Sequence, residues 1–287
     1  MSIRVGFVGL GNIGLPMAAR IVRGGFATTV FDLRPEPCAA LAALGATVAD
    51  SCAALAAETD VIGVCVRDDA DLAAALHGSD GLLATARPDT VIAVHSTVTP
   101  DTVRGLGAAA AARGVTLVDA PMTGGAAGAE NGTLTYMVGG DAAALERIRP
   151  VLETSAGRIV HAGPLGAGAV TKACNNLIQY MEFVAAREAV ALARSAGVSA
   201  ETLIEVSRSV GIMNDGMAAV VGFGDRLAAA PDNPALLARA RHFVGLADKD
   251  LGVALDCARA AGLNLPGTTT CRALMPRTYG LSDEDDA

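Results

Sequence analysis

The sequence predicts an α/β fold in which an N-terminal, doubly wound and mainly parallel sheet is followed by an all-α C-terminal domain. From residue 3 to about residue 161, short β-like runs alternate with helix-length, Ala-rich segments, as in successive βαβ units. After the glycine-rich segment 161–168 this alternation ends, and the sequence pattern predicts helices. We therefore expect a first domain over residues 1–163 and a helical second domain over residues 164–287.

The expected strands of the first domain are short runs rich in β-branched and other apolar residues. In chain order they are Ile3–Val8, Thr28–Phe31, Val61–Val66, Thr90–Val94, Thr116–Val118, Thr133–Val138 and Arg158–Val160. Helices are expected at about residues 12–24, 36–43, 52–57, 69–76, 100–113 and 141–152, several of them opened by Pro, Asp or Ser.

The second domain is expected to contain helices only. Apolar residues at helical spacing predict a long helix at about residues 168–195, which ends before Gly197. Further helices are expected at about residues 200–208, 215–229, 234–260 and 267–276. The acidic tail over residues 282–287 is expected to be disordered.

Composition excludes several classes of function. The formal net charge of −8 argues against a nucleic acid or an anionic membrane as the main partner. The N-terminus lacks the pattern of a signal peptide, and no uncharged apolar stretch approaches the ~20 residues that span a bilayer. The six cysteines are scattered without a C-x-x-C pair, so we expect reduced, mostly buried thiols and no metal site. These features predict a soluble, cytoplasmic protein.

A glycine-rich turn follows the first expected strand and precedes the first expected helix. Its sequence, Gly9-Leu10-Gly11-Asn12-Ile13-Gly14, fits the G-x-G-x-x-G pattern of dinucleotide-binding proteins. The first glycine allows the tight turn, the second lets a pyrophosphate approach the backbone, and the third lets helix and strand pack closely. The sequence therefore predicts a Rossmann-like cofactor site that includes Gly9, Gly11, Asn12, Ile13 and Gly14.

An acidic residue ends the second expected strand. Asp32 lies eighteen positions beyond Gly14, where a carboxylate can accept hydrogen bonds from the hydroxyls of an adenosine ribose. The same carboxylate would repel a 2′-phosphate, although Arg34 is near enough in sequence to reach one. We therefore expect NAD as the cofactor, with NADP less favoured.

Four separated blocks of sequence resemble one known family, the β-hydroxyacid dehydrogenases that include 3-hydroxyisobutyrate dehydrogenase. The blocks are residues 6–18 around the glycine turn, Asp119-Ala120-Pro121-Met122-Thr123-Gly124-Gly125, residues 166–176 around Lys172, and Lys249-Asp250-Leu251. The resemblance covers nearly the whole chain. It implies hydride transfer between the cofactor and a small hydroxy acid, and a homodimer or homotetramer formed through the helical domain.

The third block carries the chemistry. Lys172 and Asn176 are four residues apart, so on a helix they project from one face. Hydride transfer from a hydroxyl carbon needs a base for the hydroxyl proton, and the reverse reaction needs an acid. The resemblance assigns this acid–base role to Lys172 and an orienting hydrogen bond to Asn176. Lysine is scarce here, since Lys172 and Lys249 are the only two lysines, and both fall within the resembling blocks.

The second block predicts a site for the substrate's carboxylate. It follows a strand and enters a glycine turn whose backbone N–H groups can form a concave anion site. The resemblance implies that Thr123, Gly124 and Gly125 hold the acid group, with Thr123 where the family more often has Ser.

Other expected contacts lie at the ends of strands. By resemblance, Thr97 and the turn at Val66-Arg67 contact the cofactor, and Lys249 approaches the site from the helical domain. The family usually has an apolar residue and Pro at 66–67, so Arg67 either adds positive charge near the cofactor or faces solvent. His95 stands beside Val94, where the family often has Asp, and we expect it to lie at the sheet edge without a catalytic role.

Two alternative functions remain open. Related folds reduce C=N bonds, but those imine reductases tend to replace the catalytic lysine, so Lys172 argues against that activity. A dinucleotide-binding module without turnover would be free to lose Lys172 or Asn176, and this chain has both.

Overall fold

The computed structural model describes residues 3–281, so the acidic tail over 282–287 lies outside the described residues. The chain divides into two compact units, residues 1–172 (unit 1) and 173–287 (unit 2). This division falls inside helix α9 (Ala167–Ser195). The functional boundary expected after residue 163 stays a prediction.

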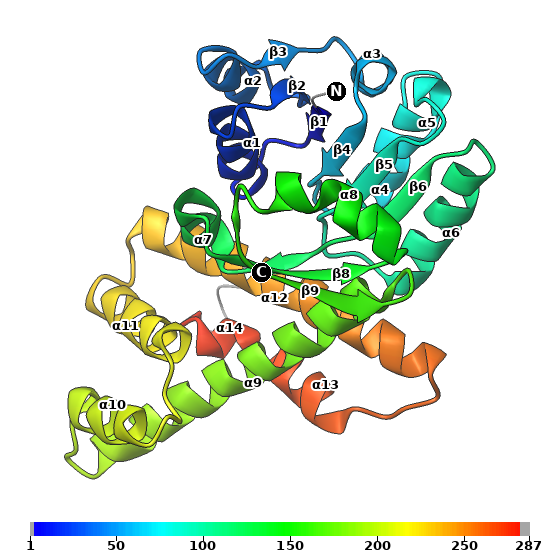
Figure 1. The fold of residues 1–287 in the computed structure, drawn as a ribbon. Helices are drawn as coiled ribbons and strands as arrows, with labels where there is room; N and C mark the ends of the chain where they lie inside the picture. The colour runs from blue at the N-terminus through cyan, green and yellow to red at the C-terminus, as the bar shows by residue number, and fades with distance from the viewer. Residues whose placement is uncertain (1–2, 282–287) are drawn as a thin grey trace. The chain divides into compact units, whose positions relative to one another are not determined.

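Unit 1 is built on one mixed sheet (Figure 1). Six parallel strands stand in the order β3-β2-β1-β4-β5-β6, and β8 continues the sheet antiparallel to β6. Their bounds are β1 (Arg4–Val8), β2 (Ala27–Phe31), β3 (Thr47–Val48), β4 (Val61–Val64), β5 (Val91–Val94), β6 (Thr116–Asp119) and β8 (Leu134–Gly139). Strand β7 (Met122–Thr123) pairs antiparallel with β8, and β9 (Ala156–Gly163) pairs parallel with it. The predicted Rossmann-like sheet is confirmed.

Helices cover both faces of this sheet. They are α1 (Gly14–Arg23), α2 (Pro35–Ala42), α3 (Cys52–Glu58), α4 (Asp69–Leu76), α5 (Leu82–Thr85), α6 (Pro100–Ala111), α7 (Gly125–Asn131) and α8 (Ala142–Leu152). One hydrophobic core includes Met17 of α1 and Ile148 of α8, and a second includes Leu55 of α3 and Val103 of α6. Every residue of β4 and β5 is buried, as expected for central parallel strands covered on both faces.

The strand order creates a switch point beside β1. From β1 the chain first adds β2 on one side, and later adds β4 on the other. In open parallel sheets, ligands bind in the crevice outside the carboxyl ends of the strands at such a point. The expected cofactor turn, which directly follows β1, therefore lies at the position that this topology favours.

The regular secondary structure in the described residues of unit 2 is all helical, as predicted. Besides most of α9 it contains α10 (Ala200–Ser209), α11 (Asp215–Ala229), α12 (Pro234–Ala260), α13 (Pro266–Ala273) and α14 (Met275–Thr278). The helix expected at 267–276 is thus two short helices. The core of unit 2 is formed by aromatic, Met and aliphatic side chains, including Tyr180, Phe183, Met217, Leu251 and Tyr279.

None of the described helices is both long enough and apolar enough to cross a bilayer. Three cysteines, Cys38, Cys52 and Cys271, are buried, whereas Cys174 on α9 is exposed.

Candidate active site

Two of the three glycines in the turn, Gly9 and Gly14, stand where other residues do not fit. Gly9 has a φ of +89°, and its N–H donates to the carbonyl of Phe31 at 3.0 Å, which ties the ends of β1 and β2 together. A Cβ on Gly14 would lie 2.0 Å from the Gly9 carbonyl oxygen, so strand and helix could not pack as they do. A Cβ on Gly11 would meet nothing within 4 Å. Gly11 therefore leaves an open approach to the backbone, as a pyrophosphate needs.

Asn12 and Ile13 complete the turn before α1. Asn12 is exposed, and Ile13 is the residue that precedes the first helical turn. No acidic side chain lies in the first turn of α1, so nothing there opposes a phosphate at the helix N-terminus. The turn and the helix end thus fit the diphosphate part of a dinucleotide.

Asp32 lies directly after β2, and its carboxylate accepts a hydrogen bond from the glycine turn. Its Oδ2 accepts from the Leu10 N–H at 2.6 Å, and its Oδ1 accepts from the N–H and Nε of Arg34 at 2.9 and 3.2 Å. Burial raises the pKa of Asp32, but backbone hydrogen bonds from Arg34 and Leu10 outweigh this effect and hold the pKa below its usual range. The carboxylate is therefore an ionised acceptor, which fits ribose hydroxyls.

The Arg34 side chain contacts both the glycine turn and Asp32. Its Nη2 donates to the Leu10 carbonyl at 3.1 Å while its Nε contacts Asp32. Asp32 and the Leu10 carbonyl thus contact the guanidinium, while the Arg34 side chain stays 61% exposed.

The ends of β4 and β5 are joined through Ser96. The Val66 N–H donates to Ser96 Oγ at 2.9 Å, so this N–H is used by the protein itself. Thr97, next to Ser96, is half-buried. Arg67 Nε lies 2.7 Å from Asp71 Oδ2 in an i,i+4 pair, and its side chain is 83% exposed. Arg67 was expected either to add positive charge near the cofactor or to face solvent, and the structure favours the solvent-facing side chain.

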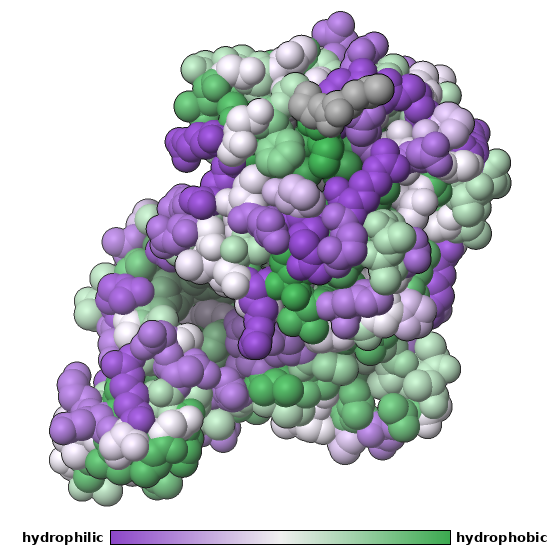
Figure 2. All heavy atoms as spheres, viewed as in Figure 1, coloured by the Kyte–Doolittle hydropathy of each residue, from purple (hydrophilic) through white to green (hydrophobic). Residues whose placement is uncertain are grey.

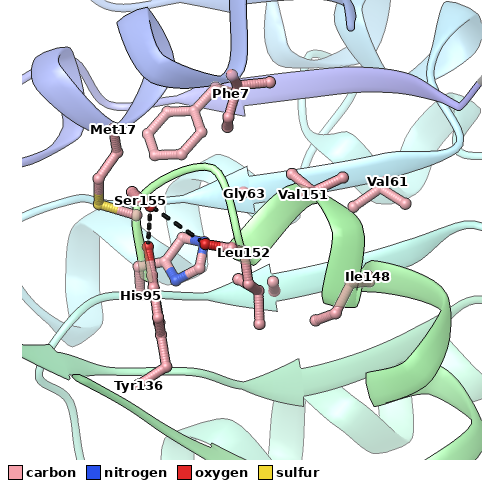
Figure 3. Close-up of a pocket in the computed structure, with 12 residues that line it drawn as sticks. Phe7, Met17, Val61, Gly63, His95, Tyr136, Ile148, Val151, Leu152 and Ser155 are labelled. Carbon is pink, nitrogen blue, oxygen red and sulfur yellow. Dashed lines mark hydrogen bonds between the residues drawn. The ribbon is translucent and has the colours of Figure 1, made fainter. Parts of the chain in front are cut away.

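His95 lies in the core of unit 1 and lines a small cavity (Figure 3). Its Nδ1 is 2.9 Å from the Ala120 carbonyl, and its ring stacks on Phe7 with centroids 5.9 Å apart. The Tyr136 ring meets it edge-on at 5.7 Å, and the Tyr136 hydroxyl contacts Ser155 at 2.7 Å. Burial lowers the pKa of His95 to about 4. His95 is thus a neutral core residue rather than a residue of the sheet edge.

The turn expected to bind a carboxylate joins β7 to α7. Thr123 ends β7 and pairs with Thr135 of β8. Gly124 and Gly125 follow with φ values of +120° and +63°, and both are exposed. Backbone angles of this kind favour glycine, and they leave the turn without side chains beyond Thr123.

Asp119, which the sequence analysis did not select, fixes the start of helix α9. It ends β6, is 1% exposed, and accepts from the N–H groups of Gly166 at 2.8 Å and Ala169 at 2.6 Å. Burial raises the pKa of Asp119, and the hydrogen bonds from Gly166 and Ala169 oppose this effect without cancelling it. A Cβ on Gly168 would lie 2.8 Å from Asp119 Oδ2 and 2.3 Å from the Met137 carbonyl, so this helix start requires glycine.

Lys172 lies half-buried in the second turn of α9, just after this anchored start. The turn at Thr123–Gly125 follows Asp119 in the chain, so one carboxylate joins the strand that leads to that turn with the helix that carries Lys172. Both features belong to unit 1, as do the glycine turn and Asp32.

Asn176 and Lys249 belong to unit 2 and meet at a second residue that the sequence analysis did not select, Asp250. Asn176 Nδ2 donates to Asp250 Oδ2 at 2.8 Å, and the Tyr180 hydroxyl donates to the same oxygen at 3.1 Å. Lys249 Nζ lies 3.2 Å from Asp250 Oδ1. Asp250 directly follows Lys249 in the fourth block of resemblance. Its place in that block was the signal in the sequence that could have identified it.

Comparison with known families accounts for both parts of the chain. Residues 4–163 match the model of the NAD-binding domain of 6-phosphogluconate dehydrogenase. Residues 166–287 match the model described as the NAD-binding domain of NADP-dependent 3-hydroxyisobutyrate dehydrogenase.

Individual relatives match over most of their length. A 3-hydroxyisobutyrate dehydrogenase of Pseudomonas aeruginosa is 37% identical over 99% of this chain and 93% of its own. An NAD-dependent L-serine dehydrogenase of the same organism is 37% identical over 92% of this chain and 88% of its own. The solved structure of Mycobacterium tuberculosis 3-hydroxyisobutyrate dehydrogenase with L-serine superposes with a TM-score of 0.82 at 33% identity, covering 96% of this chain and 94% of that one.

Imine reductases share the fold at lower identity. The Streptomyces aurantiacus enzyme is 20% identical, with a TM-score of 0.66 and coverage of 98% of this chain and 97% of that one. This likeness concerns the fold alone.

Proposed function

This chain belongs to the β-hydroxyacid dehydrogenase family, which includes 3-hydroxyisobutyrate dehydrogenase, and we propose that Lys172 is the acid–base group of its reaction. It is an NAD-dependent oxidoreductase that acts on the CH–OH group of a small hydroxy acid. The observation that carries the proposal for Lys172 is the anchoring of α9 by Asp119. A general base must be held within hydrogen-bond reach of the proton it removes, and a fixed helix start provides such positioning.

When bound, NAD would supply the hydride acceptor, and the glycine turn and Asp32 would hold it. The uncharged Lys172 amine takes the proton of the substrate hydroxyl as the carbon gives up its hydride, and the product is the semialdehyde. In the reverse direction the Lys172 ammonium returns this proton to the developing alkoxide. Lysine suits this role because its charge state responds to its surroundings, whereas arginine remains charged.

The substrate's acid group is assigned to the turn of Thr123, Gly124 and Gly125. The backbone N–H groups of such a turn, together with the Thr123 hydroxyl, offer donors to a carboxylate. Asn176, one helical turn after Lys172, orients the reacting end. For the cofactor, we assign the glycine turn and Asp32 to the pyrophosphate and ribose, and Val66, Thr97 and Lys249 to its remaining contacts. Arg67 is assigned a contact through its backbone only, because its side chain faces solvent.

The named relatives suggest one chemical class of substrate. Serine and 3-hydroxyisobutyrate share a primary alcohol on the carbon next to the one that bears the carboxylate. We therefore propose a 3-hydroxy acid of this type as the substrate. The substituent that distinguishes one such acid from another would be recognised by unit 2.

A substrate panel tests this proposal. Purified protein is mixed with NAD and, separately, with NADP, and absorbance at 340 nm is followed with 3-hydroxyisobutyrate, L-serine and 2-(hydroxymethyl)glutarate, with lactate as a 2-hydroxy acid control. We expect NAD reduction with at least one of the three 3-hydroxy acids and none with lactate. Binding of NAD without turnover on any acid would contradict the proposal and favour a non-catalytic dinucleotide-binding module.

The remaining proposals concern assembly and location. We propose a cytoplasmic homodimer or homotetramer that binds neither nucleic acid nor membrane. Hydrophobic side chains are exposed on and just after α10, among them Val206, Val210 and Ile212, and green surface is visible in this region in Figure 2. Such side chains support association through unit 2. Sedimentation velocity tests this assembly, and a monomer at micromolar concentration would contradict it.

A further inference from the structure

A buried carboxylate in unit 2 contacts the proposed substrate-orienting residue. Asp250 of α12 is 4% exposed, and Asn176 and Tyr180 of α9 are 3% and 5% exposed. Asn176 and Tyr180 are four residues apart, so both project from one face of α9. Their side-chain donors converge on a single oxygen, Asp250 Oδ2, at 2.8 and 3.1 Å.

This arrangement determines which way the Asn176 carboxamide faces. An asparagine side chain offers an NH₂ donor on one side and an oxygen acceptor on the other. A carboxylate oxygen accepts hydrogen bonds, so the NH₂ group must face Asp250, and a flipped amide would set two acceptors against each other. Asn176 Oδ1 itself accepts from Asn175 Nδ2 at 3.5 Å, the limit of a hydrogen bond. Asn176 therefore presents an acceptor, not a donor, on its remaining side.

The second oxygen of Asp250 explains why the carboxylate is tolerated. Asp250 Oδ1 is buried and has no hydrogen-bond partner among the described residues, but Lys249 Nζ lies 3.2 Å away. A buried carboxylate needs a nearby opposite charge or several donors to offset its lost hydration. Lys249 provides the charge, and Asn176 and Tyr180 provide the donors.

We propose that Asp250 is a positioning residue that fixes the Asn176 carboxamide with its oxygen turned toward the reacting groups. This inference rests on the proposed function, because it assigns Asn176 the task of accepting a hydrogen bond during the reaction. The donor is the Lys172 amino group one helical turn earlier or the hydroxyl of the substrate. No proton passes to Asn176 or Asp250, and the hydroxyl proton goes to Lys172.

A double-mutant cycle tests whether Asp250 acts through Asn176. Asp250→Asn, Asn176→Ala and the double variant are assayed with NAD and the best substrate of the panel. Asp250→Asn permits both amide orientations, so we expect kcat to fall by about tenfold, the scale of one hydrogen bond, with NAD affinity unchanged. In the Asn176→Ala background, Asp250→Asn should change kcat by less than about twofold, because interacting residues are not additive.

Two further variants keep the cycle interpretable. Asp248→Asn removes another carboxylate of α12, one that pairs with Arg272 and is half exposed, and we expect unchanged kcat. Tyr180→Phe removes one donor from Asp250 Oδ2 while it keeps the buried ring, and it replaces Asp250→Asn in the cycle if that variant does not fold. Equal losses in both Asn176 backgrounds would overturn the proposal.

A readout without turnover separates this inference from the proposed function. In protein labelled with ¹⁵N-asparagine, the Asn176 NH₂ protons should exchange slowly with water in wild type, and exchange should accelerate at least tenfold in Asp250→Ala. This result is expected even if no hydroxy acid is oxidised, in which case only the proposed function fails. Fast exchange in the wild type, or no change in Asp250→Ala, would overturn the positioning role.

Discussion

At the scale of single residues, the proposed mechanism depends on Lys172, one of two lysines in a chain that otherwise uses arginine for positive charge. Arginine stays protonated at any pH at which the protein is folded, so it cannot accept a proton from a hydroxyl. In the proposed mechanism, a lysine at position 172, in the second turn of an anchored helix, can therefore do what an arginine could not.

Replacing Lys172 should remove acid–base catalysis while it leaves cofactor binding intact. We expect Lys172→Ala to lower kcat by about 10²–10⁴-fold, the usual contribution of such a group. Lys172→Arg keeps the positive charge and should be equally impaired, which separates proton transfer from simple charge stabilisation. Steady-state kinetics and titration of NAD by calorimetry measure the two effects. Near-normal kcat in Lys172→Arg would contradict the mechanism.

Replacing Asp32 should change the choice of cofactor. Asp32→Ala removes the acceptor for the ribose hydroxyls and also releases the Arg34 guanidinium that Asp32 holds. We expect NAD affinity to fall by more than about tenfold, the scale of one charged hydrogen bond, and NADP affinity to fall less or to rise. Arg34→Ala is the control and should leave NAD affinity nearly unchanged. Equal losses for both cofactors would mean that Asp32 does not distinguish the ribose.

The residues that sequence reasoning selected and those it missed differ in the range of their contacts. The glycine turn is a local pattern, so its role can be predicted from spacing alone. Asp119 acts on Gly166, 47 positions away, and Asp250 acts on Asn176, 74 positions away. The role of a buried carboxylate depends on which donors the fold brings to it, and one sequence does not contain that information.

At the scale of elements, the turn between β1 and α1 provides a matched pair of substitutions. A Cβ at Gly11 meets open space, whereas a Cβ at Gly14 would lie 2.0 Å from the Gly9 carbonyl oxygen. Gly11→Ala should therefore fold with a nearly unchanged melting temperature but bind NAD at least about tenfold more weakly, because its methyl group occupies the path of the pyrophosphate. Gly14→Ala should lose stability as well. Thermal melts with and without NAD distinguish the two, and tight NAD binding by Gly11→Ala would contradict the site.

The start of α9 provides a second test at this scale. Asp119→Ala leaves two buried backbone N–H groups without acceptors, which should cost about 2–4 kcal/mol of unfolding free energy. Because Lys172 follows in the next turn, kcat should also fall in the fraction that remains folded. Asp101→Ala, which removes an exposed carboxylate paired with Arg104, is the control. Urea denaturation and kcat at 15 °C measure both effects, and a stable variant with normal kcat would show that Asp119 does not anchor the helix.

The long helices and most strands could be predicted from the sequence, whereas several of the shortest elements could not. The expected helix at 215–229 agrees with α11, and the expected 234–260 agrees with α12. Strands β3 and β7 have two residues each, too few to show a periodicity. Helix α7 begins at Gly125 in a segment rich in Gly and Ala, which lacks an apolar face and therefore reads as a loop.

At the scale of the whole molecule, alternation of strands and helices predicts a parallel sheet but not its order. In the structure, β1 lies between β2 and β4. This order depends on which crossover connections bury the helices against the sheet, and the sequence alone does not show that packing. The antiparallel β8, with β7 and β9 beside it, likewise departs from simple alternation. The same packing encloses His95, for which the sequence had indicated the sheet edge.

His95 gives the stability of the folded chain a dependence on pH. Its pKa is about 4 in the folded protein, because burial disfavours the charged ring, and 6.5 is the ordinary value. Between these values the unfolded chain binds the extra proton, so stability is fully present above about pH 6.5 and is lost as the pH falls toward 4. The loss attributable to His95 should reach about 3 kcal/mol. Urea denaturation at pH 7.5, 5.5 and 4.5 measures it in wild type and in His95→Phe. The variant loses the hydrogen bond to Ala120 and should be less stable at pH 7.5, yet its stability should fall less steeply with acid, and parallel curves for the two proteins would contradict a neutral, buried His95.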